Sequence, residues 1–131
     1  MSPIYVGVFL DAASIAKLLA SAKALEIPVR NMHVTFMFRL SPELVEAFSR
    51  LDGTPVTITV VGRGSDANNS GVKVSLPADL RHLYRNSAVP HVTVYLSKSG
   101  KPVDTGKLAF EDIPPFQITG TIGMFYPSER L

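Results

Sequence analysis

The sequence predicts an α+β domain in which a mainly antiparallel sheet carries helices on its outer side. Apolar patterns alternate along the chain in the order strand, helix, strand, helix, strand, strand, helix, strand, strand. No linker or low-complexity tract interrupts this order. With 131 residues and 46% hydrophobic content, the chain is long enough to bury one ordinary core. We therefore expect a single domain over residues 1–131.

The first two elements are a buried strand and an amphipathic helix. Residues 4–10 form a nearly continuous apolar run with β-branched and aromatic members, which favours a buried strand. Apolar residues then recur at helical spacing to about Glu26, with Asp11 or Ser14 as the cap. Pro28 should end this helix.

The next three elements are marked by capping residues and by alternation. Residues 29–40 read as a strand. Ser41 is a typical helix cap, Pro42 suits the first helical position, and Gly53 stops the helix. Residues 55–61 alternate valine and isoleucine with threonine, which predicts a half-buried strand.

The second half of the chain begins with a predicted hairpin. Residues 62–71 are polar and rich in glycine, which is typical of a turn, and residues 72–76 read as the returning strand. We expect a short helix over residues 77–86 and strands over 89–97 and 116–126.

Charge and composition limit the classes of function. A net charge of +2 is compatible with an anionic ligand but is too small for a long nucleic-acid track. The absence of cysteine excludes disulfides, thiolate metal sites and a cysteine nucleophile. No leader pattern is recognisable, and no apolar run approaches the roughly 20 residues that span a bilayer. We therefore expect a cytoplasmic protein.

Two of the three histidines open nearly identical strings. His33 and Thr35 stand in His-Val-Thr-Phe, and His91 and Thr93 stand in His-Val-Thr-Val. Because residues i and i+2 of a strand share a face, each string places an imidazole beside a hydroxyl. Two such strands laid next to each other would hold two histidines and two threonines around one point.

This set of side chains suits the cleavage of a phosphodiester. Histidine titrates near neutral pH, so one ring can accept a proton while the other donates one. Threonine hydroxyls can donate hydrogen bonds to phosphoryl oxygens as charge shifts in the transition state. Threonine is also common in strands for its β-propensity alone. His82 lacks a threonine two residues later, and we expect it on a helix surface.

The paired strings resemble the two-histidine (2H) phosphoesterases, whose signature is a His-x-Thr/Ser-x motif on each of two central strands. The motif separation and the order of strands and helices resemble a compact member. The resemblance implies a bilobal fold with a concave, mainly antiparallel sheet and both histidines in its groove. It also implies cleavage of RNA ends, 2′,3′-cyclic phosphates or cyclic oligonucleotides, without a metal or other cofactor. Phage anti-defence nucleases that cut cyclic-nucleotide signals are similar in size, which would place the protein in the host cytoplasm.

Three further residues are candidates for binding the substrate. Tyr5 and Tyr95 could stack on a base, although packing explains both equally well or better. Lys101 follows the second motif strand and could meet phosphate. No carboxylate shares a face with the histidines, which disfavours a metal site. We expect no membrane association and no obligate protein partner.

Two alternatives remain beside the enzyme. The same groove could sequester a nucleotide without cleaving it, although arginine or lysine would serve binding alone better than histidine. The motifs could also be coincidental in an interaction domain. Turnover of cyclic phosphates and cyclic dinucleotides separates the three.

Overall fold

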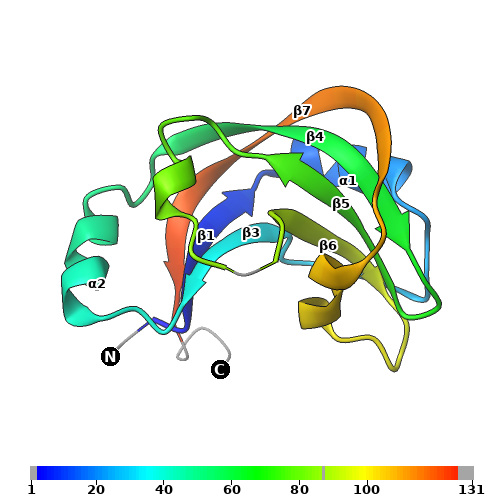
Figure 1. Ribbon diagram of the computed structural model, residues 1–131, viewed down its shortest axis with the longest axis horizontal. Helices are drawn as coiled ribbons and strands as arrows, with labels where there is room; N and C mark the ends of the chain where they lie inside the picture. The colour runs from blue at the N-terminus through cyan, green and yellow to red at the C-terminus, as the bar shows by residue number, and fades with distance from the viewer. Residues whose placement is uncertain (1–2, 87, 127–131) are drawn as a thin grey trace.

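One antiparallel sheet of seven strands dominates the part of the chain that the computed structural model describes, residues 3–86 and 88–126 (Figure 1). This arrangement confirms the α+β class, with a mostly antiparallel sheet and few helices. The strands are β1 (Tyr5–Leu10), β2 (Ile27–Pro28), β3 (His33–Phe38), β4 (Pro55–Ser65), β5 (Asn69–Ser75), β6 (His91–Leu96) and β7 (Glu111–Phe125). The helices are α1 (Ala12–Ser21), α2 (Pro42–Ser49) and the 3₁₀ segments η1 (Arg81–Leu83) and η2 (Pro102–Lys107).

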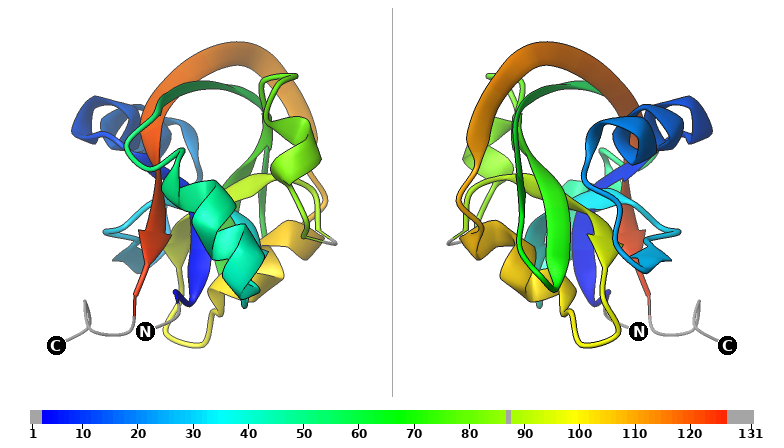
Figure 2. Two further views of the ribbon diagram at one scale, coloured as in Figure 1. Left: turned by 90° about the vertical axis from the view of Figure 1, so that its left-hand side faces the viewer. Right: turned by 90° about the vertical axis from the view of Figure 1, so that its right-hand side faces the viewer.

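The sheet is curled into a half-barrel. The strand order is β2-β6-β5-β4-β7-β1-β3, and β4 and β7 arch over the molecule in Figure 1 while the other strands descend on either side. The two further views show the same curl end on (Figure 2). It brings β3 into contact with β6, although four strands separate them in the sheet. The core lies inside the curl and includes Val8, Val34, Ile58, Val92 and Ile118, each no more than 1% exposed.

The strand order is symmetric about the β4–β7 pair. β5 and β1 flank this pair, and β6 and β3 lie beyond them, each as the carrier of one His-Val-Thr string. Strand β2 is an added edge of two residues on β6. The two strings therefore occupy equivalent places in the sheet.

Two predicted helices are shorter than expected. Helix α1 begins after Asp11, whose carboxylate accepts a hydrogen bond from the Ser14 amide, but it ends at Ser21 instead of Glu26. The chain then becomes extended and joins the edge of β6 through Ile27. In the predicted helix over residues 77–86, only η1 is helical.

Two strands are longer than expected. The glycine-rich segment predicted as a turn continues β4 to Ser65, and Asp66 closes a tighter turn by accepting the amides of Asn68 and Asn69. Strand β7 begins at Glu111 instead of Phe116. Pro114 and Pro115 of β7 lie where the pairing between β4 and β7 is interrupted. Proline has no N–H group, and none is required at unpaired positions.

Candidate active site

A cavity of about 500 Å³ lies where β3 and β6 meet. It brings together His33, Thr35, His91 and Thr93, the four residues predicted to act on a substrate. All four are half-buried, while the valines between them point into the core. The complete lining is Tyr5, Val29, Asn31, His33, Thr35, Phe38, Asn86, Ala88, His91, Thr93, Pro102 and Val103.

The two strings share a local backbone irregularity. Thr35 pairs with Gly7 of β1, and Thr93 pairs with Gly71 of β5. The next residue of each motif strand, Phe36 in β3 and Val94 in β6, has no partner, which makes a β-bulge. Such bulges redirect the side chains that follow them and recur beside active sites.

Both imidazoles are held by the same kind of hydrogen bond. Nδ1 of His33 lies 2.8 Å from the carbonyl oxygen of Asn31, and Nδ1 of His91 lies 2.7 Å from that of Val89. A carbonyl oxygen only accepts, so Nδ1 carries a proton in each ring. The Nε2 atom is therefore the nitrogen that takes up or releases a proton in both histidines.

Aromatic packing surrounds His33. Its ring stacks on Tyr5 with the ring centroids 4.7 Å apart, and the Phe9 ring lies 5.7 Å away. Burial lowers the pKa of His33, the Asn31 carbonyl raises it in part, and His91 lowers it further. At neutral pH the His33 ring is accordingly neutral, with a free electron pair on Nε2.

A glycine in η2 makes room for His91. A Cβ atom added to Gly106 would lie 2.6 Å from the Cβ of Ala88 and 2.9 Å from the His91 ring. Real contacts are longer, so any larger residue at this position would push the imidazole or Ala88 aside. The close approach of η2 therefore helps to fix the ring of the second motif.

The two threonines have different surroundings. The Thr93 hydroxyl lies 2.8 Å from the Thr105 hydroxyl and 3.3 Å from the carbonyl oxygen of Pro102. Within the described part of the chain, no hydrogen bond engages the Thr35 hydroxyl; its backbone carbonyl accepts one from the Asn86 side chain at 2.9 Å.

The three predicted substrate-binding residues are placed differently from one another. Tyr5 lines the cavity, but it is only 8% exposed and its ring stacks on His33 and on Phe125. Tyr95 lies outside the lining and donates its hydroxyl to the Leu19 carbonyl. Lys101 also lies outside the lining, and its backbone carbonyl accepts a hydrogen bond from Asn69.

The bulges explain why Tyr95 leaves the cavity. An extra residue shifts the alternation of side chains by one, so the face of His91 and Thr93 does not continue to Tyr95. The same shift in β3 turns Met37 toward the core and brings Phe38 into the lining. Simple alternation along β6 and β3 would therefore place Tyr95 on the wrong face and miss Phe38.

Other residues that build the site were not predicted from the sequence. Asn31 and Val89 act through backbone carbonyls, which no side-chain pattern reveals. Asn86 reaches the cavity from an irregular segment after η1, and Val103 reaches it from η2. The short 3₁₀ segment η2, which carries Val103, was not among the predicted elements. Val103 could therefore not be predicted as a lining residue.

The scan against protein-family models finds no match for this chain, and the search of curated proteins finds none either. Across residues 3–86 and 88–126, no three His, Cys, Asp or Glu side chains gather closely enough to hold a metal ion. None of the helices in this part of the chain has the length and apolar character needed to cross a bilayer.

Proposed function

We propose that this protein is a phosphodiesterase of the two-histidine type, which cleaves an RNA-type phosphodiester by general acid–base catalysis without a metal. The observation that supports the proposal is the meeting of two His-x-Thr strings in one cavity, each with Nδ1 protonated and Nε2 available. The symmetric strand order agrees with the bilobal arrangement that this class implies.

The two histidines divide the proton transfers. His33, with its lowered pKa, accepts at Nε2 the proton of the attacking oxygen, from water or from a ribose 2′-hydroxyl. His91 donates its Nε2 proton to the leaving oxygen as the bond from phosphorus to that oxygen breaks. Thr35 and Thr93 donate hydrogen bonds to the non-bridging oxygens.

The cavity lining supports a substrate with a single negative charge. The lining holds no Asp, Glu, Lys or Arg among the described residues, and much of it is apolar. One protonated histidine balances one phosphodiester charge, whereas the second charge of a phosphomonoester would be buried without a partner. Phe38 and Val103, which are 51% and 67% exposed, offer apolar surface to nucleobases on either side.

Substitution of each histidine tests the proposal. We expect His33→Ala and His91→Ala each to lower kcat by about 10²–10⁴-fold against 2′,3′-cyclic nucleotides or cyclic dinucleotides. The double variant should be little slower than either single one, because groups that act as a unit are not additive.

His82→Ala is the matched control, since His82 is exposed on η1 and outside the cavity lining. Circular dichroism establishes that each variant is folded. Near-wild-type turnover by a folded His33→Ala or His91→Ala protein would contradict the mechanism. Tight binding of these nucleotides by the wild type, with no turnover, would identify a sequestering module instead.

A further inference from the structure

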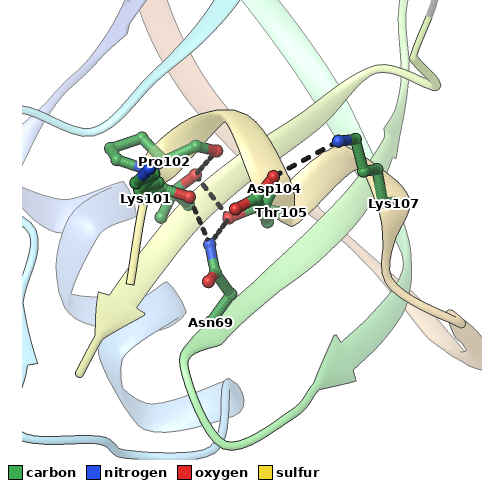
Figure 3. Close-up of polar contacts among 7 residues, drawn as sticks. Asn69, Lys101, Pro102, Asp104, Thr105 and Lys107 are labelled. Carbon is green, nitrogen blue, oxygen red and sulfur yellow. Dashed lines mark hydrogen bonds and ion pairs between the residues drawn. The ribbon is translucent and has the colours of Figure 1, made fainter. Parts of the chain in front are cut away.

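A buried polar cluster lies directly behind Thr93. It joins the Asn69 side chain at the start of β5 to the Thr105 hydroxyl in η2 and to the Lys101 carbonyl before η2 (Figure 3). Asn69 is 1% exposed and Thr105 is fully buried. Neither residue lines the cavity, so the cluster reaches it only through Thr93.

The orientation of the Asn69 amide follows from its partners. The Lys101 carbonyl lies 2.7 Å from Nδ2 and can only accept, so the nitrogen, and not the oxygen, must face it. The second Nδ2 hydrogen points to the Thr105 hydroxyl oxygen at 3.0 Å. Thr105 is therefore an acceptor in this contact.

The Thr93 hydroxyl is the second donor to Thr105. It lies 2.8 Å from the Thr105 hydroxyl and donates to it, and the Pro102 carbonyl, 3.3 Å away, is a longer alternative acceptor. Together these contacts fix the orientation of the Thr93 side chain, which lines the cavity.

We propose that Asn69 and Thr105 are positioning residues that hold the Thr93 hydroxyl in place to donate a hydrogen bond to the phosphoryl group. Asn69 donates to Thr105, and Thr93 donates to Thr105 until a non-bridging oxygen of the substrate replaces Thr105 as its acceptor. Because the Thr93 side chain is already oriented, little rotamer freedom is lost when the substrate binds. The identification of the ligand as a phosphoryl group rests on the function proposed above.

The cluster has no counterpart at the other motif. Thr35 pairs with a glycine as Thr93 does, but its hydroxyl takes part in no hydrogen bond of the described residues. The symmetric backbone thus carries an asymmetric polar network, and the inference applies to Thr93 alone.

The inference is tested with two substitutions of Thr105, one to Val and one to Ser. Each is made both in the wild type and in the Thr93→Val variant. On the cyclic phosphate that the wild type cleaves fastest, Thr105→Val should lower kcat roughly three- to tenfold. It should also weaken binding, because the non-bridging oxygens are already present in the bound substrate. Thr105→Ser should restore kcat, because it keeps the hydroxyl. In the Thr93→Val background, Thr105→Val should have no further effect on kcat.

Thr119→Val controls for loss of stability, because the Thr119 hydroxyl bonds to the Asp11 carboxylate and lies outside the cavity lining. Thermal unfolding is followed for every variant, and kinetics are measured where all are folded. Equal kcat in wild type and Thr105→Val, or an equal loss with and without the Thr93 hydroxyl, would overturn the inference while the proposed function stands.

A wild type that cleaves no compound of the panel would overturn the proposed function, and equilibrium binding of adenosine 2′,3′-cyclic monophosphate then tests the inference separately. The positioning role is supported if Thr105→Val weakens binding in the wild type but not in the Thr93→Val variant. Equal binding by the wild type and Thr105→Val, or no binding by the wild type, would overturn it.

Discussion

The two imidazoles have the same hydrogen-bond partner but different neighbours. Each donates Nδ1–H to a backbone carbonyl two residues earlier. His33 is covered by the Tyr5 and Phe9 rings, whereas His91 is packed against η2 near Gly106. Nearly identical sequence strings thus provide two environments, and only the structure distinguishes the proposed base from the proposed acid.

The pH dependence of catalysis should report the burial of His33. Because burial lowers its pKa, more acid is needed to protonate it, and the acid limb of kcat/KM should fall below the usual histidine value of about 6.5. Phe9→Ala should admit water beside the ring without altering the cavity lining, raise this pKa and move the limb to higher pH.

The measurement is a pH–rate profile paired with an NMR titration of the His33 ring protons. His82→Ala is the control for the assignment of the signals. An acid limb that follows a different titration from that of His33, or one that Phe9→Ala leaves in place, would contradict the assignment of His33 as the base.

At the level of strands and helices, the motif strands were predictable up to Thr35 and Thr93. Period-two alternation correctly placed His and Thr on one face, and it failed after the bulges because these depend on the partner strands. The glycines opposite each threonine lie 28 and 22 residues away in the sequence, so no local pattern connects them. Segments η1 and η2 are too short to show helical periodicity.

The segment after η1 should hold the free edge of β3 in place. The Arg85 amide donates to the Phe36 carbonyl at 2.8 Å, and Asn86 Nδ2 donates to the Thr35 carbonyl. Asn86→Ala removes the second bond, which is worth about 1 kcal/mol, and should lower kcat/KM roughly fivefold by loosening Thr35. Hydrogen exchange should also show less protection of the Arg85 amide.

Asn68→Ala is the matched control for this substitution, since Asn68 bonds to Ser97 at the β4–β5 turn, away from the cavity. An Asn86→Ala protein with a fully exposed Arg85 amide and unchanged kcat/KM would show that this contact does not support the site.

For the molecule as a whole, the proposed chemistry comes from two histidines and needs no divalent ion. We expect kcat to be unchanged after exhaustive dialysis against EDTA, because base and acid are both side chains of the protein. The assay uses the best cyclic phosphate of the panel, with a zinc-dependent nuclease treated in parallel as the control for chelation. Loss of turnover that one divalent ion restores would contradict the proposal.

The curl of the sheet was the least predictable feature of the molecule. The sequence indicated an antiparallel sheet and two equivalent strings, but not that four strands lie between them. Their meeting depends on twist accumulated across the whole sheet, which no single residue encodes.

Because of this curl, the distance between the two imidazoles depends on how easily the sheet bends. The path from β3 to β6 crosses β1, β7, β4 and β5, so a small change of angle at each strand pair adds to the next along this path. The bending stiffness of the sheet therefore sets how far a ligand can push the rings apart. Substitutions in β4 or β7 that alter this stiffness would change the fit of a ligand without touching it.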